Sequence, residues 1–482
     1  MPARIGVSLL CLLTTLLAAC GGPATEPGET VDTREDRPNI LFVLVDDLRW
    51  DEIGAAGHAY VRTPHIDRIA REGAMFTQAF TTTPLCSPAR ASLLTGLYPS
   101  AHGILDNLAR NEQSHRLETF PKQLAADGYD TAFVGKWHMG NDDSPRPGFN
   151  RWVSMRGQGE AIDPVLNVDG ERIPYEGYVT DLLTEHALDF VNQERDAPFL
   201  LYIAHKALHP NITQLDDGSS APSPSGIPGF IAAERHEGMY AGEFVWRRPN
   251  SGVAPTDKPA LMRRIGDLPP LGPDTVTSDE TIHQRQAMLM AVDESIGRLL
   301  TAIDAAGRLD QTIVVFTSDH GYWYGEHGLS AERRLAYEEA LRIPLLIRYP
   351  ARISPGFRPS QMALSIDLAP TLLELAGARP PAGLHGRSLV PVFDGTATDW
   401  RQSFHVEYNS DTVFERIDRM GYRAVRTDRY KYIRYLDLEG MDELYDLAAD
   451  PYELRNVIGE PQFVNVRTDM QAELERLLNA TR

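Results

Sequence analysis

Four short apolar runs in this chain each end in side chains that carry charge or exchange protons. The runs lie in "NILFVLVDD", "TAFVGKWHMG", "PFLLYIAHKALHP" and "TIVVFTSDHG". Continuous apolar runs of this length are typical of strands that are buried on both faces of a parallel sheet. The polar side chains at the four ends are Asp46 and Asp47, then Lys136 and His138, then His205, Lys206 and His209, and finally Asp319 and His320.

Helical patterns separate these runs, for example in "HQRQAMLMAVDESIGRLL". The alternation predicts an α/β fold with a mostly parallel sheet between layers of helices. In open α/β sheets, ligands bind beyond the carboxyl ends of the strands. We therefore expect the four polar ends to form one shared site.

The pattern changes after about residue 395. Basic residues alternate with apolar or aromatic ones in "YRAVRTDRYKYIRYLD", as they do in half-exposed antiparallel strands, and "QAELERLLNA" predicts a final helix. We expect a catalytic domain over residues 38–395 and a C-terminal subdomain with a small antiparallel sheet over residues 396–482. Residues 216–270, rich in Ser, Pro and Gly, predict a loop near the mouth of the site, with a merely mobile insertion as the alternative.

The N-terminus has the features of an export signal. Arg4 precedes an apolar run too short to span a bilayer, and "LAAC" resembles the box at which bacterial lipoproteins are cut and lipidated. We expect a lipoprotein signal peptide over residues 1–19 and a flexible tether over residues 20–37. The mature chain would then be exported to the bacterial periplasm or cell surface and anchored to the membrane through lipidated Cys20. The alternative is an ordinary secretory signal in which Cys20 has no such role.

One cysteine would remain free in the mature chain. The three cysteines are Cys11, Cys20 and Cys86, of which the first is removed and the second is lipidated. Residues 88–95 predict a helix that Pro88 begins and Gly96 ends. Cys86 would lie at its N-terminal end beside Arg90, where free N–H groups and the helix dipole attract a sulfate or a phosphate. The alternative is an inert thiol in a capping turn.

The net charge of −20 excludes a general nucleic-acid-binding surface, so positive charge for an anionic substrate must be local. Asp46, Asp47 and Asp319 would repel one another at a shared edge unless a cation lay between them. Carboxylate ligands favour Ca²⁺, with Mg²⁺ as the other candidate. The alternative is that Asp46 and Asp47 only end a strand or cap a helix.

The stretch "CSPARASLLTGLYPSAHGI" contains the Cys-x-Pro-x-Arg signature of the type I sulfatases, and the chain resembles that family from about residue 38 to its C-terminus. "NILFVLVDDLRWDEIG", "GKWHMG" and "SDHGYWYGEHGL" are similar to the family's other blocks, in the same order. The resemblance implies an alkaline-phosphatase-like fold and a Cys86 that a formylglycine-generating enzyme converts to formylglycine. One hydroxyl of the hydrated aldehyde attacks sulfur and the second allows sulfate release, which a thiol could not do.

The resemblance also implies a set of site residues. The metal ligands would be Asp46, Asp47, Asp319 and His320 together with residue 86. The groups expected to bind the sulfate or act in catalysis are Cys86, Arg90, Lys136, His138, His209 and Arg333, with His205 as the second choice for the place of His209. Either of these last two histidines could instead be a core or capping residue. His320 stands where many members have Asn, and Arg333 stands where members commonly have Lys, which changes reach and geometry.

The resemblance therefore implies hydrolysis of sulfate esters on a sulfated saccharide. "AHKALHP" and "AAERHEGMY" resemble bacterial branches that act on sulfated hexosamines, including 6-sulfated N-acetylglucosamine. One alternative is a formylglycine-dependent phosphonate monoester or phosphodiester hydrolase. Another is a non-catalytic glycan-binding surface lipoprotein, against which the presence of Arg90, Lys136 and His138 argues. The sequence does not define an oligomeric state.

Overall fold

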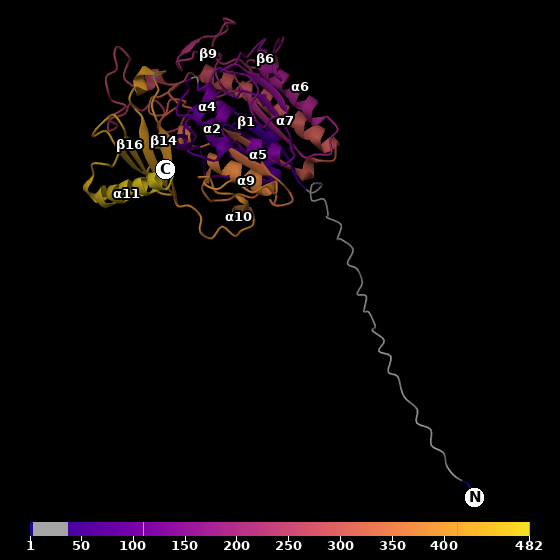
Figure 1. Ribbon diagram of the computed structural model, residues 1–482. Coiled ribbons are helices and arrows are strands. Elements are labelled where there is room, and N and C mark those ends of the chain that lie inside the picture. The colour runs from indigo at the N-terminus through magenta and orange to yellow at the C-terminus, as the bar shows by residue number, and fades with distance from the viewer. Residues whose placement is uncertain (3–36, 109, 412, 482) are drawn as a thin grey trace.

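The computed structural model describes residues 1–2, 37–108, 110–411 and 413–481. Their main body is a nine-stranded sheet in the order β2-β12-β11-β1-β8-β4-β5-β6-β7, with helices on both faces (Figure 1). The expected signal peptide and tether lie outside the described residues, apart from Met1, Pro2 and Arg37. Within the described ranges, no helix is both long enough and apolar enough to cross a membrane.

The centre of the sheet is parallel, as predicted. Its five parallel strands are β11 (Thr312–Ser318), β1 (Asn39–Val45), β8 (Phe199–His205), β4 (Asp130–Gly135) and β5 (Arg151–Met155). Antiparallel strands extend both edges, namely β12 (Leu345–Arg348) and β2 (Ala74–Met75) on one side and β6 (Val165–Val168) and β7 (Glu171–Pro174) on the other. The four apolar runs of the sequence are thus β1, β4, β8 and β11.

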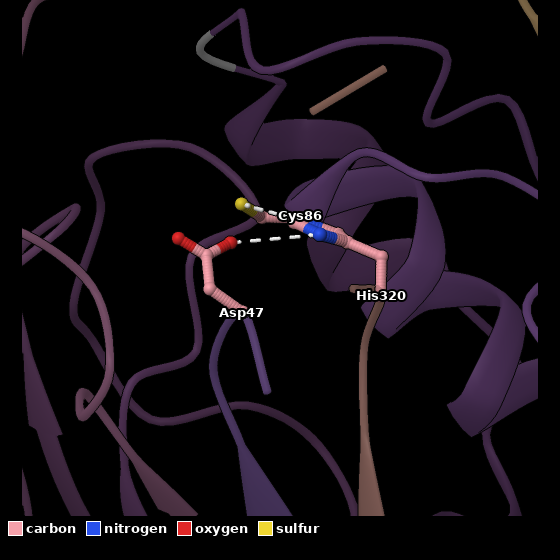
Figure 2. Close-up of side chains that lie close together, drawn as sticks. All are labelled: Asp47, Cys86 and His320. Atoms are coloured by element: carbon pink, nitrogen blue, oxygen red, sulfur yellow. Dashed lines mark hydrogen bonds and ion pairs between the residues drawn. The ribbon is translucent and has the colours of Figure 1, made fainter. Parts of the chain in front are cut away.

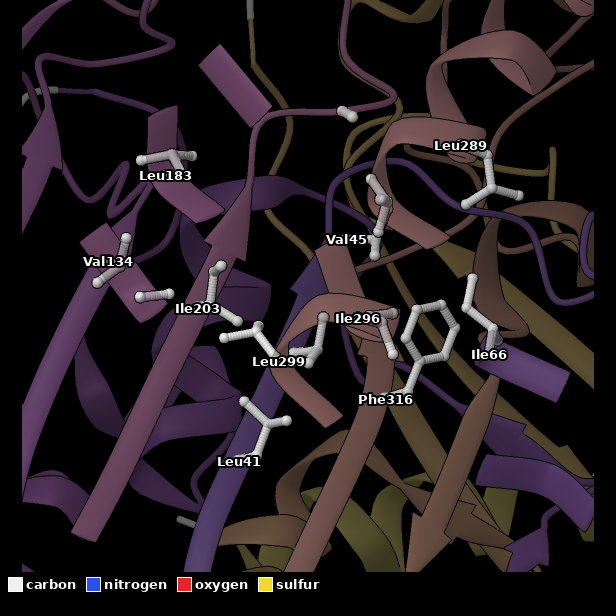
Figure 3. Close-up of a cluster of buried hydrophobic side chains, with 14 of the residues drawn as sticks. Leu41, Val45, Ile66, Val134, Leu183, Ile203, Leu289, Ile296, Leu299 and Phe316 are labelled. Atoms are coloured by element: carbon white, nitrogen blue, oxygen red, sulfur yellow. The ribbon is translucent and has the colours of Figure 1, made fainter. Parts of the chain in front are cut away.

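Side chains of β1 alternate between two cores, because successive residues of a strand face opposite sides of a sheet. Leu41 and Val45 lie in one core, which α1 (Pro64–Glu72), α6 (Val179–Val191) and α7 (Asp279–Ala305) cover. Figure 3 shows Ile296 and Leu299 of α7 among these side chains. Phe42 and Leu44 lie in the opposite core, under α2 (Cys86–Thr95), α5 (Phe120–Ala126) and α9 (Leu368–Leu375). Every residue of β1 is buried, and all of them after Asn39 are apolar.

The C-terminal part forms a separate antiparallel sheet beside the main body (Figure 1). Its strands are β14 (Ser403–Tyr408), β15 (Tyr422–Thr427), β16 (Tyr430–Tyr435) and β17 (Glu443–Asp446). The final helix, α11 (Val464–Ala480), packs Met470 and Leu474 against Val425 and Tyr432 of this sheet. The small antiparallel sheet and the final helix expected from the sequence are both present.

Helix α2 begins at Cys86, two residues earlier than the sequence suggested, and the N–H of Ala89 already donates to the carbonyl of Leu85 at 2.9 Å. Pro88 is compatible with this because the first turn of a helix needs no N–H donors. Gly96 ends the helix with a φ of 71°, which favours glycine. The other short helices are α3 (Pro99–His102), α4 (Asn111–Arg116), α8 (Glu338–Leu341) and α10 (Val390–Phe393).

The segment over residues 216–270 is largely irregular, as predicted. It follows strand β9 (Ile212–Gln214), which pairs with β10 (Ser220–Pro222) in a small hairpin, while β3 (Ala79–Phe80) pairs with β13 (Ala363–Leu364) elsewhere. The side chain of Asn141 donates to Asp216 at 2.8 Å, and Arg248 forms an ion pair with Asp51 at 2.7 Å. These contacts hold two parts of the segment against loops that follow β4 and β1.

Candidate active site

Two parallel strands deliver four candidate ligands to one place. Val45 at the end of β1 is in register with Ser318 at the end of β11, so the residues that follow them leave the sheet at the same level. The backbone N–H of Asp47 donates to Asp319 Oδ1 at 3.1 Å. Helix α2 brings Cys86 to the same point, with its Sγ 3.4 Å from His320 Nε2. Figure 2 shows the side chains of Cys86 and Asp47 close together, both facing the His320 ring, whose Nδ1 lies 3.5 Å from Asp47 Oδ1.

The donor set fits a divalent cation. Two overlapping groups have their ligand atoms within 4.8 Å of one another, namely Asp47, Cys86 and His320, and Asp46, Cys86 and Asp319. All five residues are buried. Asp47 Oδ2 has no hydrogen-bond partner among the described residues. Asp47 Oδ1 and Asp46 Oδ1 meet guanidinium nitrogens, of Arg333 at 2.9 Å and of Arg90 at 3.2 Å, in ion pairs without hydrogen-bond geometry. Buried carboxylate oxygens are costly unless a cation meets them, and three carboxylates with one imidazole suit a hard cation better than a soft one.

Arg90 and Lys136 surround the same acids. Arg90 contacts Asp319 Oδ2 at 3.0 Å and Asp46 Oδ1 at 3.2 Å, and the ammonium of Lys136 contacts Asp46 Oδ2. Lys136 reaches this position because Gly135 lets β4 approach β8 closely. A Cβ added at residue 135 would lie 2.0 Å from a backbone oxygen of β8, and the φ of Gly135 is 126°. The buried site therefore holds cations fixed beside the acids, where they can also meet an anion.

Arg333 and His209 close another side of the site. Arg333 Nε lies 2.9 Å from Asp47 Oδ1, and its Nη2 lies 2.9 Å from His209 Nε2. A guanidinium can only donate, so His209 Nε2 accepts and its Nδ1 carries the proton, which it donates to the carbonyl of Pro210 at 2.8 Å. The structure therefore brings Arg333 to the acids, where it bridges the Asp47 carboxylate and the His209 imidazole.

His138 lies beside these groups on the segment after β4. Its Nε2 lies 2.7 Å from Oε1 of Gln214, and its backbone carbonyl accepts from the hydroxyl of Ser87 at 2.5 Å. Burial, followed by Lys136 and Arg90, holds the pKa of His138 well below its ordinary value. The ring is therefore neutral and able to accept a proton.

His205 is not brought to this group. It ends β8, and strand alternation puts its side chain on the face of Ile203, toward α6. Neither of its ring nitrogens has a hydrogen-bond partner among the described residues, and burial lowers its pKa to about 4. The structure places His209, four residues later, at the site instead.

The acids and His320 perturb one another strongly. Burial opposes ionisation of Asp46, but Lys136 and Arg90 outweigh it and hold the Asp46 pKa well below its ordinary value. Burial and the charge on Asp46 raise the pKa of Asp319. Burial disfavours a charged His320, yet Asp319 and the group at residue 86 raise the His320 pKa to about 9. A cation among these ligands would relieve the same repulsion.

Two residues that contact the site were not singled out from the sequence. Gln214 lies in the hairpin after β8, where no motif marks it. Arg285 lies on α7 and donates to the carbonyl of Asp47 at 2.7 Å and to that of Leu208 at 3.0 Å. A fully buried arginine within an otherwise apolar helix face was the one signal that could have identified it.

The fold and the site together define a hydrolase for an anionic ester. Carboxylates for a divalent cation, a reactive position at a helix N-terminus and buried cations converge beyond the carboxyl ends of parallel strands. The chain matches the family described as Sulfatase over residues 38–378, and the family described as N-sulphoglucosamine sulphohydrolase, C-terminal, over residues 325–480. It belongs to the sulfatase family, and it is a sulfuric ester hydrolase with the alkaline-phosphatase-like fold.

Characterised relatives match nearly the whole chain. An N-acetylglucosamine-6-O-sulfatase of Bacteroides thetaiotaomicron is 32% identical, with 100% of this chain and 91% of the relative covered. The human N-acetylglucosamine-6-sulfatase is 27% identical, with 93% and 85% covered. A protein solved in complex with its substrate D-glucosamine-2-N,6-O-disulfate is 28% identical, with a TM-score of 0.77 and coverage of 92% of this chain and 98% of that one.

Proposed function

We propose that this sulfatase removes 6-O-sulfate from N-acetylglucosamine units of a sulfated glycan, with residue 86 in the formylglycine form. The names of the bacterial and human relatives and the disulfated glucosamine in the solved neighbour support this substrate class. The observation that carries the chemistry is the position of Cys86. It begins α2, and its Sγ lies 3.4 Å from His320 Nε2. Its Sγ also lies within 4.8 Å of carboxylate oxygens of Asp46, Asp47 and Asp319.

The residues around position 86 have complementary roles in this proposal. Formylglycine supplies a hydrated aldehyde with two hydroxyls, of which one is the nucleophile and the other allows sulfate to be released as the aldehyde re-forms. Arg90, Lys136 and Arg333 orient the sulfate oxygens and stabilise the charge that develops on them, since all three are buried and point to the ligand acids. His138 is a neutral imidazole whose Nδ1 is available for proton transfer. His209 is also neutral and lies on the side of the leaving alcohol, where Arg333 and the carbonyl of Pro210 hold its two ring nitrogens.

We propose Ca²⁺ as the cation, held by Asp46, Asp47, Asp319 and His320, with Mg²⁺ as the other candidate. Bound at these ligands, a divalent cation supplies positive charge to the sulfate group. Ca²⁺ is favoured because it accepts an irregular set of oxygen ligands more readily than Mg²⁺ does. The imidazole of His320 is the one ligand that does not belong to this hard-oxygen pattern.

Removal of the cation should therefore destabilise the protein as well as inactivate it. Treatment with a chelator is expected to lower Tm, and Ca²⁺ at 100 times its Kd should restore about 2.7 kcal/mol of stability. Asp319→Asn, which removes one ligand, should lose most of this response in thermal unfolding. A chelated protein with full activity and unchanged Tm would exclude the proposed metal site.

Two measurements test the proposed function. Mass spectrometry of the peptide that contains residue 86 reports conversion to formylglycine, and Cys86→Ala is expected to lose activity entirely. Rates on 6-sulfated N-acetylglucosamine are then compared with rates on 3-sulfated N-acetylglucosamine, 6-sulfated galactose and an aryl phosphonate. A preference for the phosphonate would favour the phosphonate hydrolase, and a converted but inactive protein that binds the glycan would favour a non-catalytic binder.

We also propose that a formylglycine-generating enzyme modifies the exported chain and that a lipid on Cys20 anchors it to the membrane. The "LAAC" box and the free thiol left at position 86 support this proposal. Expression with a labelled fatty acid should label the wild type and leave Cys20→Ala unlabelled. Release of Cys20→Ala into the soluble fraction is the expected companion result, and equal labelling of both proteins would contradict it.

A further inference from the structure

The two ring nitrogens of His138 have very different surroundings. Nε2 lies 2.7 Å from Gln214 Oε1, whereas Nδ1 has no hydrogen-bond partner among the described residues. The side chain is only 1% exposed, so bulk water cannot choose freely which nitrogen carries the proton. That choice depends on whether Gln214 presents an acceptor or a donor to the ring.

Two neighbours fix the orientation of the Gln214 amide. Its Nε2 donates to the backbone carbonyl of Asn107, which can only accept. The Nε2 of Gln158, which can only donate, lies 3.2 Å from Gln214 Oε1. A turned amide would place two donors together at Gln158 and two acceptors together at Asn107. Oε1 of Gln214 therefore faces His138, and the ring must donate from Nε2.

The same contacts continue to the reactive position. The side-chain oxygen of Asn107 accepts from the N–H of Ser87 at 3.1 Å, and the Ser87 hydroxyl donates to the carbonyl of His138 at 2.5 Å. Ser87 follows Cys86 in the first turn of α2. The β9–β10 hairpin, His138 and residue 86 are thus held in one continuous group of buried hydrogen bonds.

We propose that Gln214 is a positioning residue that keeps His138 protonated on Nε2 and leaves Nδ1 free as the proton acceptor of the hydrolytic reaction. When Nδ1 takes a proton from a hydroxyl in the site, the ring becomes an imidazolium whose Nε2–H still donates to Gln214 Oε1. The imidazolium returns to neutral by giving the Nδ1 proton to water. This inference rests on the proposed role of His138 in proton transfer.

The first test is Gln214→Met, which keeps the length of the side chain and removes its hydrogen bonds. The expected loss in kcat on a sulfated monosaccharide is about 10- to 100-fold, because second partners of a functional imidazole have effects of this order. KM should stay within about threefold of the wild-type value, since Gln214 acts on the ring and not on the substrate. Gln158→Met, which removes one of the two contacts that fix the amide, should show a smaller loss.

The second test reads the tautomer directly and needs no activity. The unconverted protein is labelled with ¹⁵N-histidine, and the His138 signals are those missing from His138→Asn. The wild type should carry the proton on Nε2, whereas Gln214→Met should show a mixture with the Nδ1-protonated form. Ser220→Ala is the matched control, because Ser220 pairs with Gln214 across the hairpin and is exposed.

The outcomes separate this inference from the proposed function. A folded Gln214→Met with wild-type kcat, or one that loses kcat while His138 stays fully protonated on Nε2, would overturn the positioning role and leave the function intact. A fully active His138→Asn would instead refute the proposed role of His138. The tautomer measurement would then still report whether Gln214 orients the ring. Ser220→Ala should match the wild type in kcat, Tm and tautomer.

Discussion

At the scale of single residues, substitutions of Arg333 can show whether the site needs a guanidinium that donates to two partners or only a positive charge. Its guanidinium contacts both Asp47 and His209 at 2.9 Å. Arg333→Ala is expected to lower kcat/KM about 100- to 1,000-fold, as expected for the loss of a buried group that stabilises developing charge. Arg333→Lys should recover only part of this, because a point charge cannot bridge two partners. Steady-state kinetics on a sulfated monosaccharide measure both effects. A fully active Arg333→Lys would show that simultaneous contact with Asp47 and His209 is dispensable.

His205 gives the opposite expectation, because it is buried away from the acids. Its pKa in the folded protein is lowered to about 4, mainly by burial, with Asp181 acting weakly in the other direction. A lowered histidine pKa contributes stability above about pH 6.5, and this stability is lost as pH falls toward 4. His205→Leu should therefore keep kcat/KM within about twofold. Between pH 7 and pH 4.5 its free energy of unfolding should fall by about 2–3 kcal/mol less than that of the wild type.

Denaturant unfolding of the two proteins across this pH range measures the difference, since other titrating groups are common to both. A large loss of activity in His205→Leu would restore the sequence-based alternative in which this histidine contacts the substrate. An unchanged pH profile of stability would mean that the ring is solvated in the folded state.

The residues of the site could be predicted when they directly follow a strand or carry a motif. Asp46, Asp47, Asp319 and His320 are of this kind, because neighbouring parallel strands must end at one edge. Gln214 and Arg285 were not predicted, and only Arg285, as a charged residue among the apolar residues of a helix face, offered a signal. Gln214 meets His138 across 76 positions of sequence, and Arg285 meets Asp47 across 238, so only the folded chain brings them together.

At the scale of elements, α7 does more than cover the sheet. Its Arg285 donates to the carbonyls of Asp47 and Leu208, and so joins the loop that carries the candidate metal ligands Asp46 and Asp47 to the loop that carries His209. It also forms a buried ion pair with Glu52 at 3.3 Å. The helix thereby holds two loops of the site at a fixed separation.

Arg285→Met should test this role. The change leaves the Glu52 carboxylate buried without its counter-ion and is expected to cost about 3–5 kcal/mol in the free energy of unfolding. If the proposed divalent cation binds at Asp47, the change should also raise the cation concentration needed for half-maximal activity, because the Asp47 carbonyl loses a donor. Arg298→Met on the same helix is the control. Its ion pair with Glu185 is exposed, so a change below about 1 kcal/mol is expected.

Strands and helices could be predicted from the sequence most readily where all of their residues are buried. Four of the five parallel strands read as apolar runs because both faces are covered, whereas β5 was not predicted. The antiparallel strands β6 and β7 were not predicted, since they mix exposed and buried positions. Strand β12 is buried throughout but was also not predicted, and it has only four residues. The start of α2 was placed two residues late, because Pro88 is compatible with more than one position in a first turn.

At the scale of the whole molecule, the two sheets share one core and one buried group of charges. Phe80 and Tyr337 of the main body lie in the same apolar cluster as Phe404 and Tyr445 of the C-terminal sheet. Next to this cluster, Lys431 of β16 contacts Glu338 of α8 at 2.9 Å. Because core and charges both cross the boundary, we expect the two parts to unfold together.

Lys431 is the side chain on which this connection can be tested. It is fully buried and also contacts Glu453 at 2.8 Å, while Glu338 has a second cation in Arg426 at 3.3 Å. Lys431→Met therefore leaves Glu453, and not Glu338, without a cation. At a pH above 8, where Glu453 is ionised in the wild type, the expected cost is about 3–5 kcal/mol, which is typical when one partner of a buried pair is removed.

The pH dependence of that cost identifies its cause. Burial raises the pKa of Glu453 to about 8 even beside Lys431, so its contribution to stability is present at low pH and is lost as pH rises through 8. Without Lys431 the pKa rises further, and the difference between variant and wild type should grow from pH 7 to pH 9. In Lys431→Met/Glu453→Gln the growth should disappear, because no buried acid is left to ionise. A cost that stays constant with pH in the single variant would assign it to lost packing of the lysine stem and not to the charge on Glu453.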